Sequence, residues 1–306
     1  MRRCMTFCSA VLIVPVLAAT ALAADYAGAD VCKTCHPAEF EAQSRSAHAG
    51  ALAPSHTGQP GEWAFGAGAQ AITFVSRVDR ENYLEHGETW YRTLNGYAVT
   101  PGHRNSLGVS FRIFDPVARI LRCFACHSTG PLTLGESDDQ IVPHELGVRC
   151  EVCHGPAALH ARDPVRNHPR NPGAMTAADL NRFCGTCHGT AQQAGQQPTD
   201  LRDPRNSRNE PLLLSASACF RRTKGGMACL ACHSPHEPLQ TKAAAYDSIC
   251  RNCHAAPRHS SAIAAQACVD CHMPSVPFQN LAFRNHRIAV YAAGDPVQPL
   301  SAKARK

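Results

Sequence analysis

The pattern Cys-x-x-Cys-His occurs seven times in this chain of 306 residues, and it constrains the fold more than any other feature. Two thiols at this spacing can add across the two vinyl groups of one haem, and the following histidine then lies where it can ligate the iron. A zinc or thioredoxin-like site also uses Cys-x-x-Cys, but neither needs a histidine directly after the second cysteine. Seven complete copies therefore predict seven covalently bound c-type haems. A zinc-ribbon array and a disulfide framework are the weaker alternatives.

The predicted haem-binding residues follow directly from these motifs. The attachment cysteines are Cys32, Cys35, Cys123, Cys126, Cys150, Cys153, Cys184, Cys187, Cys229, Cys232, Cys250, Cys253, Cys268 and Cys271. The proximal iron ligands are His36, His127, His154, His188, His233, His254 and His272. No catalytic residue is assigned.

Three of the 17 cysteines lie outside the motifs, and two of them belong to the N-terminal segment. Residues 1–24 contain Cys4 and Cys8, begin with a basic pair after Met1, continue through a short apolar run and end in small residues. This order is typical of a signal peptide, and the run is shorter than the roughly 20 apolar residues of a spanning helix. We expect cleavage near Ala23/Ala24 and a periplasmic or otherwise exported protein, and peripheral contact with the membrane stays open. For Cys219, an inert buried thiol and a redox thiol both stay open.

Composition predicts a fold in which haem replaces much of the usual core. About one haem is expected per 40 residues of the mature chain, and only 6% of the residues are aromatic. We therefore predict a mainly α and irregular multihaem cytochrome c, with short helices and loops wrapped around seven covalently bound haems. Without haem such a chain should be largely unfolded. The net charge of +6 is spread along the sequence, so nucleic acid is not expected as a partner.

The spacing of the motifs suggests how the chain is divided. The long gap between the first two motifs contains β-branched and aromatic residues between glycines, which predicts a small β-rich insertion at about residues 62–114. Proline and acidic residues at 37–43 and the run 176–183 favour short helices. The expected segments are a signal peptide (1–24), a first haem segment (25–61), the β-rich insertion (62–122), a haem segment with motifs two to four (123–190), a polar connector (191–218), a haem segment with motifs five to seven (219–290) and a flexible tail (291–306).

Histidine is the expected second axial ligand of most haems. Only Met175, Met227 and Met273 remain in the mature chain, whereas ten histidines lie outside the motifs. Bis-histidine coordination is therefore the default prediction, and the residues alone leave open which of the ten bind iron. These ten are His48, His56, His86, His103, His144, His160, His168, His236, His259 and His286.

Several stretches resemble one family of multihaem proteins. They are residues 26–37 with 46–48, residues 150–156 with His160, residues 229–236, residues 268–274 with 285–288, and residues 100–103. These stretches are similar to the cytochrome c-554 and c-prime family (cytochrome c-552/4), which is related in haem packing to pentahaem nitrite reductase and octahaem hydroxylamine oxidoreductase. The resemblance implies that His48, His160, His236, His259 and His286 are distal ligands. It leaves His103 and His144 undecided and makes His56, His86 and His168 surface or supporting residues.

Two functions of different kinds fit this pattern. The first is an electron carrier whose haems exchange electrons with redox partner proteins, such as a quinol dehydrogenase, other cytochromes or a terminal reductase. The alternative is an oxidoreductase with one open haem acting on a nitrogen or sulfur compound such as nitrite or hydroxylamine, with His103, Arg104, Tyr97 and His168 as candidates to line its pocket. The Cys-x-x-Cys-Lys motif typical of the related nitrite reductases does not occur here. A structural or docking module built on the β-rich insertion is a third, weaker reading.

Overall fold

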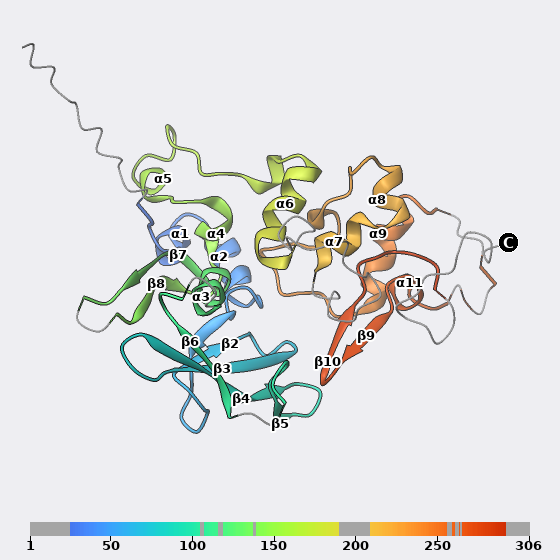
Figure 1. The fold of residues 1–306 in the computed structure, drawn as a ribbon. Helices are drawn as coiled ribbons and strands as arrows, with labels where there is room; N and C mark the ends of the chain where they lie inside the picture. The colour runs from blue at the N-terminus through green and yellow to red at the C-terminus, as the bar shows by residue number, and fades with distance from the viewer. Residues whose placement is uncertain are drawn as a thin grey trace, which may run out of the picture.

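The computed structural model describes residues 25–104, 107–115, 119–136, 139–189, 209–255, 259–260, 263 and 265–291. The expected signal peptide, most of the expected connector and the tail after residue 291 lie outside the described residues. The first half of the chain contains the main sheet and the second half contains mostly short helices (Figure 1).

A six-stranded antiparallel sheet occupies the long gap between the first two motifs. Its strands are β1 (Leu52–Pro54), β2 (Trp63–Phe65), β3 (Ala71–Arg77), β4 (Asn82–Tyr91), β5 (Gly96–Val99) and β6 (Gly108–Arg112), and β1 to β5 follow one another in space. β4 is the central strand because β3 pairs along one of its edges, while β5 and β6 share the other. β-branched and aromatic residues at alternating positions favour these strands.

The protein's own apolar core lies between this sheet and the second motif. Phe124 and Ile120 of helix α3 (Ile120–His127) are fully buried against Phe65 and Tyr83 of the sheet. The Phe124 ring meets the rings of Trp63, Phe65 and Tyr83 edge-on, a favourable arrangement for aromatic side chains. The second motif is thus seated in a packed aromatic core, whereas composition alone predicted that haem would supply most of the buried apolar mass.

Two further hairpins lie outside the predicted β-rich insertion, so the fold contains more strand than expected. β7 (Ser128–Leu134) pairs with β8 (Ile141–Leu146), and β9 (Ser275–Phe278) pairs with β10 (Leu281–Arg284). Each hairpin contains a proline, which argues against a strand in the interior of a sheet. In a two-stranded ribbon every strand is an edge, and β7 also carries an irregularity between Thr129 and Leu132 that accommodates the break.

The helices are short, and most of them lie at the motifs. In the first half they are α1 (Ala29–Lys33), α2 (Pro37–Ser44), α3, α4 (Cys150–His154), α5 (Ala158–Arg162), the 3-10 turn η1 (Pro172–Ala174) and α6 (Ala177–His188). In the second half they are α7 (Glu210–Ser215), α8 (Ala218–Arg222), η3 (Cys229–Ala231), η4 (Ala243–Tyr246), α9 (Asp247–Arg251) and α11 (Cys268–His272). α2 and α6 match the two helices expected from sequence. α7 occupies part of the expected connector and buries Leu213 and Leu214.

The C-terminal hairpin joins the two halves of the molecule. The Gln70 side chain donates to the carbonyl of Ala282 at 2.9 Å and accepts from its N–H at 3.3 Å. The Thr93 hydroxyl donates to the carbonyl of Asn280 at 2.8 Å. In Figure 1 the β9–β10 hairpin accordingly reaches toward the main sheet. None of the described helices is long and apolar enough to cross a membrane.

Candidate haem-attachment sites

Each motif begins on a short helical segment with its histidine at or just past the end. α3, α4, α6 and α11 end at their motif histidine. In motifs one, five and six the histidine N–H donates to the carbonyl of the first cysteine, at 2.9 Å for His36 and 3.0 Å for His233 and His254. One helical turn therefore sets the first cysteine and the histidine on the same face, as attachment to a single macrocycle requires.

Five motif histidines have a second histidine ring facing them. The ring centres are 6.0 to 6.4 Å apart in all five pairs. The pairs are His36 with His160, His188 with His48, His154 with His236, His233 with His286, and His272 with His259. All five histidines that the resemblance implied as distal ligands take part, each against a different motif.

These separations fit one iron atom between two imidazoles. A metal–imidazole bond is about 2.0–2.1 Å, and a ring centre lies roughly 1.1 Å beyond its nitrogen, so ring centres on opposite sides of one metal are roughly 6.3 Å apart. Direct stacking of aromatic rings also covers this range, but it does not explain why each contact joins a motif histidine to a histidine from elsewhere in the chain. The donor set and its spacing thus fit haem iron.

Hydrogen bonds at Nδ1 orient several of these imidazoles. Nδ1 of His154 is 2.9 Å from the carbonyl of Arg170, and Nδ1 of His272 is 2.8 Å from that of Ala289. Nδ1 of His127 and of the distal His160 are likewise close to backbone carbonyls, at 2.8 and 2.7 Å. A carbonyl at Nδ1 fixes the proton there and leaves Nε2 free to bind metal, which is the usual outer-shell arrangement for ligating histidines.

Burial favours the neutral, ligating form of several histidines. It lowers the pKa values of His48, His154, His233 and His286, and neighbouring histidines at His48 and His233 lower them further. His188 differs because the Glu210 carboxylate raises its pKa, with Oε2 3.4 Å from Nδ1. A histidine must be neutral to bind a metal, so the lowered pKa values favour the ligating form of His48, His154, His233 and His286.

The other histidines have different surroundings. His103 is buried, and its Nε2 lies 2.9 Å from Oε2 of Glu85. His86 is bonded to the Ser76 hydroxyl at 2.7 Å. The His144 ring lies against Tyr26, with centres 5.3 Å apart, while His56 and His168 are exposed. None of these five is among the histidine ring pairs of the described residues.

The histidines of motifs two and six are not among the five histidine ring pairs of the described residues. His127 has the ring of Phe65 beside it, with ring centres 5.4 Å apart. His254 is exposed. Of the pocket residues named for an open haem, His103 is close to Glu85, Tyr97 contacts Phe74 and His168 is exposed.

Cysteines of different motifs are neighbours in a continuous series. Electrostatically interacting thiols connect motif one to three, two to four, four to five, and six to seven. The pairs are Cys32 with Cys150, Cys126 with Cys187, Cys184 with Cys229, and Cys250 with Cys268. Cys153 and Cys187 also interact electrostatically, as do Cys232 and Cys250, which connects motif three to four and five to six. All seven attachment sites thus form one connected set.

The alternative uses of cysteine are not realised among the described residues. All fifteen described cysteines are free thiols, and no group of three or more described His, Cys, Asp or Glu side chains is arranged to hold a metal ion directly. Cys219 lies near Cys232 and Cys250, between motifs five and six.

Two supporting residues have no signal in the sequence. Arg170 donates to the carbonyls of Val152 and Cys153 at 2.9 and 2.8 Å, and its guanidinium stacks on Phe183, 4.6 Å from the ring centre. It therefore links motif three to the helix of motif four. Glu210 reaches His188 from 22 residues downstream. Neither residue type nor spacing could have identified these roles.

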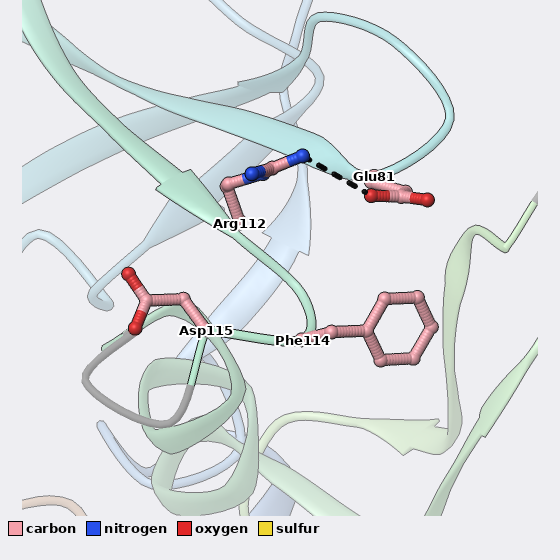
Figure 2. A pocket seen from close by; sticks show the side chains of 4 residues that line it. All are labelled: Glu81, Arg112, Phe114 and Asp115. Carbon is pink, nitrogen blue, oxygen red and sulfur yellow. Dashed lines mark ion pairs between the residues drawn. The ribbon is translucent and has the colours of Figure 1, made fainter.

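A surface hollow lies apart from the motif residues. Glu81, Arg112, Phe114 and Asp115 line about 410 Å³ beside the β4–β6 edge (Figure 2). The Arg112 guanidinium is 3.7 Å from the Glu81 carboxylate across it. No motif cysteine or histidine lines this hollow, so it does not belong to the haem sites.

Comparison with known proteins supports the same class. Residues 105–155, which include motifs two and three, match the family described as cytochrome c554 and c-prime. A comparison with curated protein sequences finds no match. Among solved structures, the outer cell wall cytochrome OcwA is similar with a TM-score of 0.55 and 16% identity, over 86% of this chain and 79% of that one.

A second similar structure is the undecahaem cytochrome from the S-layer of Carboxydothermus ferrireducens. Its TM-score is 0.51 at 18% identity, over 87% of this chain and 52% of that one. At these identities the likeness concerns the fold. With the motifs and the match over residues 105–155, it identifies this chain as a multihaem c-type cytochrome.

Proposed function

We propose that this chain is an exported heptahaem c-type cytochrome that carries electrons through an array of mostly bis-histidine haems. The five histidine ring pairs at 6.0 to 6.4 Å carry this proposal, because two strong protein ligands on one iron would leave no position for a substrate at those five sites. Bound haem supplies one-electron redox chemistry at each site. The chain's residues attach the macrocycle through thioethers, hold the two imidazoles and exclude other ligands.

The ligand pairs also connect the segments of the chain. His160 follows motif three but faces His36 of motif one, and His236 follows motif five but faces His154. A distal histidine thus serves a different motif from the one it follows, as expected for a residue too close in sequence to cross its own macrocycle. This exchange of ligands would keep neighbouring haems close together.

The cysteine contacts favour electron transfer among all seven sites. Contacts run from motif one through three, four, five and six to seven, and motif two joins the series at motif four. Neighbouring attachment sulfurs place neighbouring macrocycles near each other. A connected series supports a carrier more than isolated binding sites would.

Export and protein redox partners complete the proposal. The two similar structures are described as outer cell wall and S-layer cytochromes, and covalent haem attachment agrees with an extracytoplasmic location. We expect cleavage of residues 1–24 near Ala23/Ala24, and a partner such as a quinol dehydrogenase, another cytochrome or a terminal reductase.

Carbon monoxide addition to the fully reduced holoprotein tests the proposal, together with a haem count from the pyridine haemochrome and the protein mass. We expect seven haems per chain and a Soret change on addition of carbon monoxide equivalent to no more than two haems, because five motif histidines have a second histidine facing them. Fewer than seven haems would overturn the count. A Soret change equivalent to more than two haems would contradict the histidine pairs, and turnover of nitrite or hydroxylamine would favour the oxidoreductase alternative, because an open iron can bind small ligands.

A further inference from the structure

Glu151 is a buried carboxylate inside motif three. It lies between Cys150 and Cys153, and its exposed fraction is 2%. Among the described residues, no lysine or arginine forms an ion pair with it. Its oxygens instead accept three backbone N–H groups at 2.8 Å each, from Ala27, Gly28 and Ala157. A buried charge without a cation is costly, and these three bonds offset part of its desolvation.

The same contacts bring Glu151 next to motif one. Gly28 has a φ of 81°, a conformation that glycine adopts at little cost, and its N–H thereby reaches Glu151. Helix α1 begins at the next residue, and the Cys32 thiol lies 3.8 Å from the Gly28 carbonyl. Burial, Cys150 and the negative charge of Glu151, in that order, raise the pKa of the Cys32 thiol to about 11. Glu151 therefore lies inside motif three and is bonded to the residue that precedes the helix of motif one.

The charged side chains nearby are bonded to groups other than Glu151. Glu145 accepts from the N–H of Ala29 through both oxygens, so a second carboxylate faces the same junction. Arg149 lies 3.7 Å from Glu145 and is paired with it. Arg170 binds the carbonyls of Val152 and Cys153 on the same motif. The bonds of each arginine are thus made to groups other than Glu151.

We propose that Glu151 lowers the reduction potentials of the haems attached at motifs one and three. Reduction adds one negative charge to a haem, and a fixed negative charge close by in a poorly screened interior disfavours that addition. The junction of motifs one and three is then the low-potential end of the array. This inference rests on the proposed attachment of haem at those two motifs.

Spectroelectrochemical titration of the full-length holoprotein tests the inference, with Glu151→Gln compared to Glu151→Asp. Gln removes the charge and keeps an acceptor oxygen and similar shape, whereas Asp keeps the charge on a shorter side chain. We expect Gln to raise two of the midpoint potentials and leave the rest in place, with unchanged low-spin electron paramagnetic resonance signals. Asp should lower thermal stability and leave the potentials low.

Two further variants complete the design. Asp270→Asn removes a carboxylate from motif seven, but Asp270 is exposed and bonded to Arg284 at 2.7 Å, so we expect no resolved shift. Glu145→Gln should raise the same two potentials by less than Glu151→Gln, because Arg149 already offsets Glu145. This variant decides the matter if Glu151→Gln does not fold.

The outcomes are distinct. Unchanged potentials in both Gln variants, or equal shifts in Glu151→Gln and Glu151→Asp, would overturn the inference and leave Glu151 a structural residue. A wild-type protein matured without haem at motifs one and three would instead overturn the proposed function, and the haem count made before titration detects this.

Discussion

At the scale of single residues, His236 is close in sequence to one motif but close in space to another. It lies three residues after His233, yet its ring faces that of His154 of motif three, with centres 6.0 Å apart and planes 14° apart. His233 is instead faced by His286. The haem that loses a ligand when His236 is removed is therefore expected to be the one at motif three.

Replacing His236 by alanine should open one iron to external ligands. We expect the reduced variant to bind carbon monoxide at about one haem more than wild type, with the haem count unchanged, because a missing imidazole leaves a free axial position. The matched control is His168→Ala, since His168 is exposed and outside the ring pairs. More carbon monoxide binding by the control than by wild type, or no increase in His236→Ala, would contradict the assignment.

Protonation of His86 makes the free energy of unfolding depend on pH. Burial lowers its pKa below the ordinary value of 6.5, while the unfolded chain keeps that ordinary value. Below pH 6.5 the unfolded chain therefore binds more protons, and this contribution to stability falls as the pH drops from 6.5 toward the folded-state pKa.

Thermal melts of wild type and His86→Gln across this range measure the effect. Gln can keep a hydrogen bond to Ser76 but does not titrate, so the variant should lose less stability than wild type on acidification. Parallel losses in the two proteins would show that His86 does not contribute.

At the scale of elements, helix α3 joins the haem chemistry to the protein core. Phe124 lies between the two cysteines of motif two and is fully buried against the main sheet. Strand propensity and the glycine-bounded runs made the sheet predictable, because those signals are local. The β7–β8 and β9–β10 hairpins were not predictable, because their prolines argue against strands. Proline is tolerated in an edge strand, but only the tertiary structure shows that these strands are edges.

Phe124→Ala should be among the most destabilising single changes in the sheet-bearing half. It removes a buried ring and leaves a cavity at a site that meets three aromatic side chains, which costs about 3–5 kcal/mol. Denaturant unfolding followed by far-ultraviolet circular dichroism measures the loss. Val165→Ala, at an exposed position, should change stability by less than about 0.5 kcal/mol. A loss below about 1 kcal/mol at Phe124 would contradict the packed core.

At the scale of the whole molecule, few contacts hold the C-terminal hairpin against the main sheet. Gln70 and Thr93 supply three of its hydrogen bonds from the first half of the chain to residues 280 and 282. Other contacts between the halves include the ring pair of His154 and His236 and the neighbouring thiols of Cys184 and Cys229. The position of the hairpin should be sensitive to substitution of Gln70, because this side chain makes two of its bonds to the first half.

Gln70→Ala removes two of these bonds and should weaken docking by about 1–3 kcal/mol. Hydrogen exchange should become faster in residues 275–284 and stay unchanged in the β7–β8 hairpin. Gln59→Ala is the matched control, because the Gln59 side chain accepts a hydrogen bond from the exposed backbone N–H of the nearby His56, within the same loop. Equal exchange in wild type and Gln70→Ala would show that the hairpin is held by other contacts.

The class of protein could be predicted from sequence because its defining chemistry is contained in five consecutive residues. Two cysteines and a histidine within one helical turn specify a covalent haem site wherever the segment lies, and seven repetitions exclude coincidence. Histidine surplus and methionine scarcity likewise favoured bis-histidine ligation without structural information. These inferences need no knowledge of distant contacts.

The arrangement of the sites was decided by tertiary structure. The histidine pairs join residues from 13 to 140 positions apart, and no local pattern encodes which ring faces which. The bonds of Arg170, Glu210 and Glu151 depend on the same long-range packing. Motif chemistry is local, whereas the pairing of histidine rings and the placement of charges follow from how separate segments of the chain pack, and only the tertiary structure shows that packing.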